Sequence, residues 1–562
     1  MEKKVYADYH GPRCTREHDG KVAQWKYYGT AKKSNAEQTY ANHNADCILE
    51  SGLHDVAALS YPLVGMQSQR DPDYIEYQIL TAKLAHIDGF FVEWGFREHE
   101  SNEELQIMMK MAQKLDFEIG INWCDAWHFY PWIEAFYPDA VTREKKVDLF
   151  IRNVQYLLDT LYATSVGATI ENHPLLLLFG GGPTIEEFRR IRQAAYTLPA
   201  EVEMPYFLVR APIAGKDKGG QVSYWLEKNG WPDVADGIFG WIPTRVRNGL
   251  ITEQFKDWDR YAVPEDTIAY LEALRKAMKD TNSKVHVSCV NPEMDNRACA
   301  SWNKHDLSCI PRAGGCTYEK MWKNNVEHKQ DLDIVYIVSW NDYTERHQIE
   351  PTLADSYREM ETTRKYAAQF KGMKEDGRSG DFLLPLRLFY LRKKTRKLSK
   401  AGYCMAPYLG AMEQIVQNIS NGRLGEAELL LEALEKLLED LEGQMLTRQL
   451  LLTQKSGELT VEGKNICILS EEALQYMKEW AYDAWLYFSY CEETEASFQL
   501  FYGQQELCDI KIDGNGNWKK AKIRIFQENM QYIESEPVIR LEGTVQIREV
   551  SLVLQAYRSW KG

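Results

Sequence analysis

The stretch DIVYIVSWNDYTE, residues 333–345, places an unbroken apolar run directly before a cluster of polar side chains. Apolar residues at nearly every position are typical of a strand that is buried on both faces, as in a parallel sheet covered by helices. The run ends at Trp340, and Asn341, Asp342 and Glu345 follow it at once. The stretch therefore predicts a buried parallel strand whose carboxyl end carries two acids.

Further apolar runs of the same kind precede this one, and amphipathic stretches separate most of them. The other predicted strands are residues 4–9, 88–94, 117–123, 174–180, 205–210, 236–241 and 284–290. The helical patterns lie at residues 73–87, 103–115, 145–162, 184–198, 267–280 and 318–329. This alternation predicts an α/β fold, a (β/α)8 TIM barrel with long loops. A doubly wound open sheet is the alternative, but the sequence lacks the glycine-rich nucleotide fingerprint that such sheets usually carry.

The composition of the 562-residue chain is globular, with 44% hydrophobic residues and a formal net charge of −15. Nucleic acids and anionic membranes attract basic surfaces, so this charge argues against both as partners. No run of about 18 apolar residues occurs, so no membrane-spanning helix is expected. The 16 Trp and 32 Tyr supply flat rings for stacking on sugars or on other planar, weakly polar ligands.

The eleven cysteines are scattered without CxxC or zinc-like spacing, which is typical of reduced thiols in the cytoplasm. The first residues, MEKKVYADYHGPRC, lack the apolar core of a secretory signal. We therefore expect a cytoplasmic protein, or a secreted one only if a leader has been removed. The oligomeric state stays open.

Polar and aromatic residues follow almost every predicted strand. In (β/α)8 barrels the carboxyl ends of the strands build the active site, so these residues are candidates for ligand binding. They are Tyr9, His10, Glu93, Trp94, Trp123, Asp125, Trp127, Arg210, Trp241, Asn291, Asp295, Arg297, Trp340, Asn341 and Glu350. Tryptophan recurs beside a carboxylate among them, a combination typical of clefts that bind and cleave sugars.

Asp342 and Glu345 are the candidate catalytic residues. Cleaving a glycosidic bond needs one carboxylic acid to protonate the leaving oxygen and a second carboxylate to activate the attacking group. Residues three apart on a helical turn have Cβ atoms about 5–6 Å apart, which leaves both retaining and inverting outcomes open. The structural alternative is a capping box, in which Asp342 caps the next turn and Glu345 completes the box.

The segment SWNDYTERHQIEPT, residues 339–352, resembles the strand-eight signature of glycoside hydrolase families 71 and 99, endo-acting α-glucanases and α-mannanases. The stretch KVYADYHG at the start and residues 61–96 and 291–322 are similar to other parts of these families, so the resemblance covers residues 1–370. It implies a hydrolase of α-linked oligosaccharides or glycoconjugates. It also implies that Glu345 is the general acid and Asp342 the base, acting on water or on the substrate's own 2-hydroxyl.

Carbohydrate is therefore the expected partner. No HxH or HExxH motif occurs, so neither a metal nor another cofactor is expected. Two alternatives from other classes remain: a non-catalytic saccharide-binding protein and a glycan-assembly factor of a polysaccharide cluster. The sugar, its linkage and endo or exo action stay open.

Composition shifts after the barrel predict two more regions. We expect the catalytic barrel at residues 1–375, a linker and helical hairpin at 376–457, and an antiparallel β-sandwich at 458–562. The basic stretch 393–400 is interpreted as a linker or a solvated face. The leucine-rich stretch 424–445 is interpreted as a packing face, which could also pair two subunits. The sandwich resembles the jelly-roll carbohydrate-binding modules of many glycosidases, with a purely structural role as the alternative.

Overall fold

The computed structural model divides the chain into two compact units. The first comprises Met1–Pro12, Gln78–Cys299 and Lys304–Phe382, and the second comprises Arg13–Tyr77, Ala300–Asn303 and Leu383–Gly562. The structure describes residues 2–11, 13–25, 43–195, 197, 202–218, 221–246, 253–301, 307–374, 376–462, 465–491, 495–513, 516–530 and 538–560.

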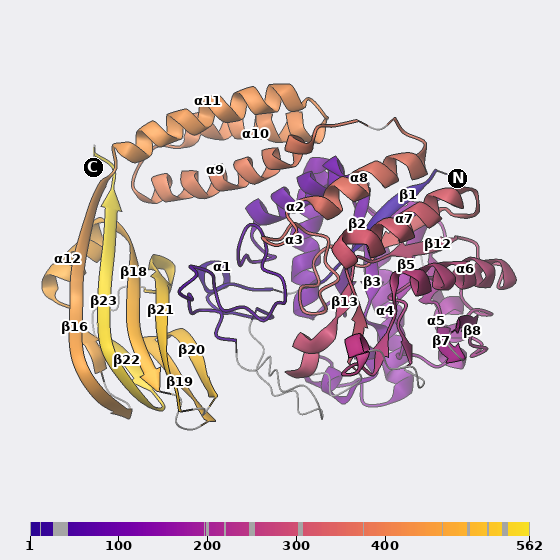
Figure 1. Ribbon diagram of the computed structural model, residues 1–562, viewed down its shortest axis with the longest axis horizontal. Coiled ribbons are helices and arrows are strands. Elements are labelled where there is room, and N and C mark those ends of the chain that lie inside the picture. Colours follow the sequence, from indigo (N-terminus) through magenta and orange to yellow (C-terminus); the bar gives the residue numbers. More distant parts are fainter. Residues whose placement is uncertain are drawn as a thin grey trace. The chain divides into compact units, whose positions relative to one another are not determined.

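The first unit is built around a closed barrel of eight parallel strands (Figure 1). The strands are β1 (Lys4–Tyr9), β2 (Gly89–Trp94), β3 (Glu118–Trp123), β5 (His173–Leu178), β6 (Tyr206–Arg210), β9 (Gly237–Phe239), β12 (Val287–Val290) and β15 (Ile334–Ile337). They pair in this order, and β15 pairs with β1 to close the barrel. The short β4 (Thr169–Ile170) adds an antiparallel edge to β5. The (β/α)8 fold and the eight predicted strands are confirmed.

The apolar runs form strands because both of their faces are covered. In β15, Val335, Tyr336 and Ile337 are each at most 1% exposed, although successive side chains point alternately into the barrel and toward the helices. Polar residues such as Asp8, Glu93 and Asn122 lie next to the last residue of their strands, so the carboxyl ends of the strands form a polar rim.

Helices alternate with the strands along the chain and surround the barrel (Figure 1). They are α2 (Pro72–Leu84), α3 (Glu100–Leu115), α4 (Arg143–Thr160), α5 (Ile185–Ala195), α6 (Pro264–Asp280), α7 (Cys316–Glu327) and α8 (Arg358–Lys371). Local signals set their ends: Thr142 accepts a hydrogen bond from the Lys145 amide at the start of α4, and Gly372 ends α8 in the left-handed conformation. None of the helices in the described part of the chain is long and apolar enough to cross a membrane.

Short strands in the long loops after β6, β9 and β12 form a six-stranded sheet that the sequence analysis does not predict. They are β7 (Ile213–Lys218), β8 (Gln221–Leu226), β10 (Arg245–Val246), β11 (Arg260–Tyr261), β13 (Met294–Asp295) and β14 (Ser308–Ile310). Four of them have only two or three residues, and β7 is largely polar, so no apolar run marks them.

The second unit contains two four-stranded antiparallel sheets. One holds β16 (Leu446–Glu462), β18 (Ala481–Cys491), β21 (Trp518–Phe526) and β23 (Thr544–Arg558), and the other β17 (Asn465–Ile468), β19 (Glu495–Tyr502), β20 (Gln505–Asp513) and β22 (Val538–Glu542). Helix α12 (Glu471–Glu479) follows β17. Buried side chains from both sheets, such as Leu486 and Leu500, form one core, so the predicted antiparallel sandwich is confirmed. Its first strand begins at Leu446, before the predicted boundary at 458, because the leucine-rich helical pattern runs into it without a break.

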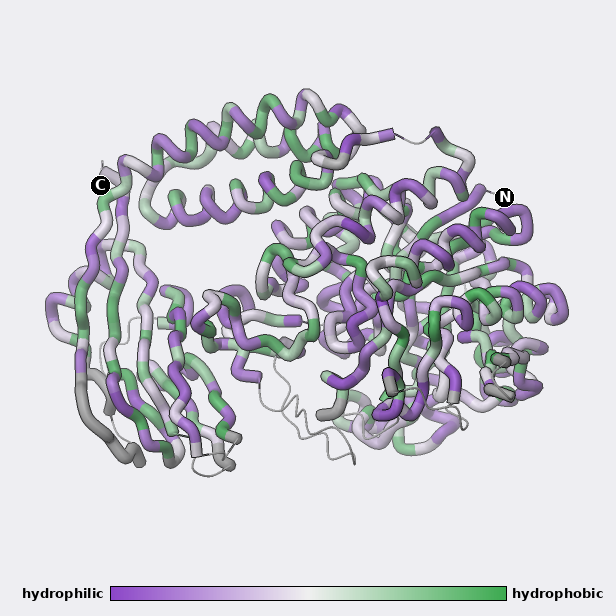
Figure 2. Tube along the Cα trace, viewed as in Figure 1, coloured by the Kyte–Doolittle hydropathy of each residue, from purple (hydrophilic) through white to green (hydrophobic). Residues whose placement is uncertain are grey.

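Three helices of the second unit, α9 (Leu383–Lys400), α10 (Ala406–Ser420) and α11 (Leu424–Gly443), lie side by side (Figure 1). Figure 2 shows hydrophobic and hydrophilic residues alternating along α10 and α11, as in amphipathic helices. The basic stretch 393–400 is the end of α9 and not a linker. Its side chains are paired, since Lys393 and Arg396 contact Asp71 at 2.7 and 2.8 Å.

Part of the loop after β1 belongs to the second unit. Its short helix α1 (Arg16–Asp19) begins with the buried Arg16, which pairs with Asp46 at 2.8 Å. Asn44 exchanges two hydrogen bonds with the backbone of Lys511, and Cys47 forms an antiparallel bridge with Ile523. The range predicted for the barrel, residues 1–375, is therefore interrupted by a segment that packs on the sandwich sheets.

Truncation after residue 460 is expected to unfold what remains of the second unit, because it removes the partners of Asn44 and Cys47. Residues 43–57 would then expose apolar surface, and limited proteolysis should cleave them rapidly. Mass spectrometry of the fragments measures this against the full chain. Unchanged protease resistance of residues 43–57 in the truncated chain would contradict the expectation.

Candidate active site

The turn after β15 holds both predicted catalytic acids. Asp342 Oδ1 accepts hydrogen bonds from the amides of Thr344 and Glu345, each 3.0 Å long, so this oxygen caps the turn. The reciprocal half of a capping box is absent, because the amide of Asp342 donates to the Ser339 hydroxyl instead of to Glu345. Asp342 therefore caps the turn as the capping alternative predicts, but Glu345 does not complete the box. The cap uses only Oδ1 of Asp342.

The buried His347 lies between the two acids. Its Nε2 is 3.3 Å from Asp342 Oδ2 and 3.2 Å from Glu345 Oε2. Burial by itself lowers the pKa of the imidazole, but the two carboxylates outweigh it and raise the pKa to about 9. His347 is not among the predicted site residues. Its position two residues after Glu345 is the one sequence feature that indicates such a role. His347 approaches the acids because the chain reverses at Arg346, where φ is 59°.

A second imidazole approaches Asp342 from the end of β1. His10 Nδ1 lies 3.6 Å from Asp342 Oδ2, and His10 Nε2 lies 2.5 Å from Asp8 Oδ2. Burial lowers the pKa of His10, but the charges of Asp8 and Asp342 raise it well above its usual value. Asp8 is itself fixed, since its Oδ1 accepts hydrogen bonds from Asn122 and Tyr336 at 2.7 and 2.6 Å.

Glu93, near the end of β2, joins this cluster. Its Oε2 lies 3.5 Å from His10 Nδ1, and its Oε1 accepts a hydrogen bond from the Cys124 thiol at 3.3 Å. The carboxylates around the two imidazoles are those of Asp8, Glu93, Asp342 and Glu345. The predicted site residues His10, Glu93, Asp342 and Glu345 are therefore brought together at the carboxyl ends of the strands.

Three other predicted contact residues hold the loops together. Asn341 accepts a hydrogen bond from the amide of His10 and donates one to its carbonyl oxygen, at 2.8 and 2.9 Å, which joins the ends of β1 and β15. Tyr9 donates to Gln78 at 2.8 Å, and Gln78 donates to Glu350 at 3.0 Å. Tyr9, Asn341 and Glu350 are buried, and these contacts position the rim of the barrel.

Trp94, Trp123 and Trp340, three of the predicted substrate-binding residues, are fully buried core residues. The Trp123 ring stacks on Phe150 with centroids 4.2 Å apart, and the Trp94 indole donates to Asn102 at 3.2 Å. Successive residues of a strand point to opposite faces, so Trp94 points away from the cluster that Glu93 enters. This burial corrects the expectation that these three residues contact a substrate.

The loop after β3 uses Asp125 and Trp127 for its own packing. Asp125 accepts hydrogen bonds from the amides of Gly180 and Gly182 at 2.6 and 3.1 Å, which ties this loop to the loop after β5. Burial raises the pKa of Asp125 to about 6. The Trp127 ring packs on His99 with centroids 4.9 Å apart. The contacts described for both side chains are thus with loop residues, in place of the expected ligand contact.

The loop after β12 also braces itself. Arg297 donates from Nε and Nη2 to the two carboxylate oxygens of Asp295 at 2.9 and 2.5 Å. The Asp295 amide donates to the carbonyl of Glu345 at 2.9 Å, and the buried Asn291 donates to the carbonyl of Glu293. Asp295 therefore ties this loop to the acid turn, and the contact of these three residues with a sugar stays a prediction.

Trp241 and Arg210 keep accessible surface near the acids. Trp241 is half-buried, and its ring meets His347 edge to face with centroids 6.4 Å apart. Arg210 is exposed, its guanidinium lies over the Phe179 ring at 4.2 Å, and its charge acts on Glu345. Among the predicted stacking residues, Trp241 is the one that contacts the acid cluster through its ring.

Trp241→Ala is expected to weaken oligosaccharide binding by about 0.5–1.5 kcal/mol, because it removes the aromatic face beside the acids. Intrinsic fluorescence of the unaltered protein should change on addition of the sugar, and Trp241→Phe should abolish most of this change. Trp560 is 69% exposed and lies in the second unit, so Trp560→Ala serves as the matched control. Equal affinities for Trp241→Ala and the unaltered chain would contradict stacking at this position.

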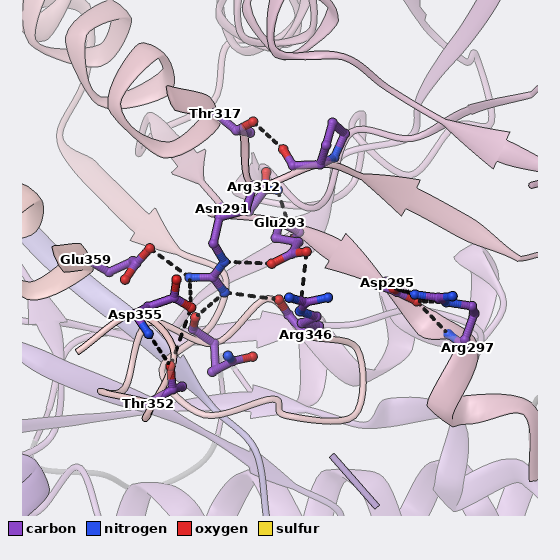
Figure 3. Close-up of polar contacts among 12 residues, drawn as sticks. Asn291, Glu293, Asp295, Arg297, Arg312, Thr317, Arg346, Thr352, Asp355 and Glu359 are labelled. Carbon is purple, nitrogen blue, oxygen red and sulfur yellow. Dashed lines mark hydrogen bonds and ion pairs between the residues drawn. The ribbon is translucent and has the colours of Figure 1, made fainter. Parts of the chain in front are cut away.

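A buried arginine, Arg312, holds the turn from within the unit (Figure 3). Its guanidinium forms ion pairs of 2.6 Å with Glu293 and 2.7 Å with Glu359. Its Nη2 group donates to the two backbone carbonyls on either side of His347, at 3.4 and 3.3 Å. Arg312 therefore fixes the backbone that carries His347 between the acids.

Three side chains of the cluster have the chemistry of metal ligands. In the part of the chain that the structure describes, one donor atom from each of His10, Asp342 and His347 lies within 4.8 Å of the others. They come from the two ends of the barrel sequence, so no short motif of the HxH type marks them. The absence of an HxH or HExxH motif therefore does not indicate whether this cluster binds a metal.

No protein-family model matches the chain, and no curated protein matches it in sequence. Among solved structures, the GH99 endo-alpha-mannosidase from Bacteroides thetaiotaomicron matches with 16% identity and a TM-score of 0.44, and its complex with BIS-TRIS-propane with 16% and 0.43. Both matches cover 66% of this chain and 98% of the mannosidase. A glycoside hydrolase-like protein matches with 10% identity and a TM-score of 0.42, over 66% of this chain and 94% of that one. Family 99, to which the name of the mannosidase refers, is one of the two families that residues 339–352 resemble.

Proposed function

We propose that the protein is a glycoside hydrolase that cleaves α-linked oligosaccharides or glycoconjugates. The observation that carries the proposal is the acid pair: Asp342 and Glu345 lie on one turn at the carboxyl end of β15, and both approach Nε2 of His347. Hydrolysis of a glycosidic bond requires two such carboxyl groups, one as a general acid and one to activate the attacking group.

The surroundings of the two acids support different roles. The Glu345 side chain is 28% exposed and that of Asp342 only 9%, so Glu345 is the acid that a leaving oxygen can reach. The orientation of Asp342 is fixed by the two amides on its Oδ1, which leaves Oδ2 directed at the cluster. We assign Glu345 as the general acid and Asp342 as the base.

The short separation of the acids supports a retaining course. Their nearest oxygens lie 3.3 and 3.2 Å from one nitrogen atom. These two oxygens are therefore no more than about 6.5 Å apart. In inverting enzymes the carboxyl groups are about 6.5–9.5 Å apart, which leaves room for a water molecule between them. On this proposal Asp342 acts on the substrate's own 2-hydroxyl group rather than on water.

Release of reducing ends from a panel of α-linked glucans, mannans and glycoconjugates tests the proposal. The full chain should release them, and a Glu345→Gln, Asp342→Asn double variant should not. Glycan binding without release would instead favour a non-catalytic saccharide-binding protein. Neither binding nor release with any glycan of the panel would overturn a carbohydrate function of this site.

A further inference from the structure

We propose that His10, Asp342 and His347 form a binding site for a divalent transition-metal ion such as Zn²⁺. The donor atoms are Nδ1 of His10, Oδ2 of Asp342 and Nε2 of His347. Two imidazole nitrogens and one carboxylate oxygen are a ligand set that zinc accepts, with a fourth position for water or another ligand.

The spacing of the donors fits one shared ion. Ligands about 2.0–2.2 Å from a tetrahedral zinc ion are about 3.3–3.6 Å from one another. Asp342 Oδ2 lies 3.3 Å from His347 Nε2 and 3.6 Å from His10 Nδ1. One ring nitrogen of His10 and one of His347 lie within 4.8 Å of each other. An ion can thus be bound with only small side-chain shifts.

The neighbours of the three ligands hold them in a binding orientation. His10 Nε2 faces Asp8 Oδ2 at 2.5 Å, which directs Nδ1 toward Asp342, and Asp8 is fixed by Asn122 and Tyr336. Such carboxylate–histidine pairs support metal-binding histidines in many proteins. Asp342 Oδ1 is occupied by two backbone amides, which leaves Oδ2 as its metal-binding atom.

The charge around the ligands favours a dication. Glu93 Oε2 lies 3.5 Å from His10 Nδ1, and Glu345 Oε2 lies 3.2 Å from His347 Nε2. With Asp8 and Asp342, four carboxyl groups therefore surround the two imidazoles, and this surplus of acidic over basic side chains favours a dication. Glu93 and Glu345 keep 20% and 28% exposure, so either can supply the fourth ligand or leave that position to water.

The donor set also selects the kind of ion. Imidazole nitrogen suits Zn²⁺, Cu²⁺ and Ni²⁺, whereas Mg²⁺ and Ca²⁺ prefer sites made of oxygen ligands. Since the ion would bind the oxygen that the proposed function gives to the base, metal binding and glycan cleavage would exclude each other. Only this last consequence rests on the proposed function. The site itself rests on geometry.

Direct binding tests the site. The full chain is stripped with a chelator and then titrated with Zn²⁺ in competition with a chromophoric chelator. One ion per chain should bind, and Co²⁺ in its place should give the visible absorption of a tetrahedral complex. Mg²⁺ should not compete. Failure of Zn²⁺ to bind would overturn the proposal, whatever the outcome of the glycan assays on the metal-free protein.

Substitutions locate the ion. His10→Gln and His347→Gln should each weaken Zn²⁺ binding by more than the about 10–100-fold expected for Asp8→Asn, which removes a supporting contact and no ligand. His18 forms a separate pair with Asp19 at 3.1 Å, so His18→Gln is the matched control and should bind as the unaltered chain does. Circular dichroism checks that each variant is folded. Unchanged affinity in folded His10→Gln and His347→Gln would show that the ion binds elsewhere.

Discussion

Glu345→Gln is expected to lower turnover of an unactivated α-linked oligosaccharide by about 10²–10⁴-fold, the usual scale for loss of a general acid. An activated aryl glycoside should be partly spared, because a good leaving group needs less protonation. Steady-state kinetics on the two substrates measures the difference. The substitution keeps the shape of the side chain, so the melting temperature should change little.

Asp342→Asn should lower turnover on both substrates by a similar factor, because the attacking group must be activated whatever group leaves. Asparagine retains an oxygen that accepts the amides of Thr344 and Glu345, so the turn should stay intact. Glu265 is an exposed carboxylate of the same unit with no contact to the acid cluster in the described residues, and Glu265→Gln is the control. It should keep turnover within about tenfold of the unaltered chain, because it lies outside the acid pair.

Two results would contradict these roles. Variants that melt much earlier yet keep near-normal turnover per folded molecule would show that Asp342 and Glu345 only cap the turn. A Glu345 variant that loses equal activity on both substrates would show that it does not protonate the leaving group.

Arg312→Ala is expected to destabilise the first unit by about 3–5 kcal/mol, the cost of removing one partner from a buried ion pair. Glu293 and Glu359 would lose their buried cation and keep only the more exposed Arg346 and Arg358 as partners, and the carbonyls beside His347 would lose their donor. We expect a lower melting temperature by calorimetry. The folded fraction should also lose turnover, because His347 is no longer held between the acids.

Arg358 supplies the control, because it also contacts Glu359, at 3.0 Å, but its side chain is 38% exposed. Arg358→Ala should cost no more than about 1 kcal/mol, as exposed ion pairs do. Equal destabilisation by the two substitutions would show that the burial of Arg312 does not increase its contribution to stability.

The barrel could be predicted from the sequence because its strands are buried on both faces. Burial on both faces requires near-continuous apolar runs, such as VYIV before Ser339. Few other structural environments require such runs. The position of the acid pair followed, since the rule that carboxyl ends of strands form the site needs only the strand boundaries. The six-stranded sheet of the loops could not be predicted, because four of its strands have only two or three residues and so no detectable periodicity, and β7 is largely polar.

Contacts between distant segments explain what else was missed. His347 is a site residue only because the chain reverses at Arg346, and Trp94 is a core residue only because Glu93 takes the inward position on β2. A sequence gives the residue types at the rim but not which neighbour faces inward. For the same reason, the pairing of Arg16 with Asp46 and of Asn44 with Lys511 was not foreseen.

The assignment of residues 13–77 to the second unit also has a consequence for synthesis. Cys47 leaves the ribosome early, but its partner Ile523 is made 476 positions later, roughly 25–95 s at common elongation rates. Strand β1 pairs with β15 after a shorter interval, because Ile334 is made 330 positions after its partner Lys4. Apolar residues of the 43–57 segment therefore remain without their sheet until Ile523 has been made. We expect chaperones that recognise unfolded chain to bind this segment during that interval.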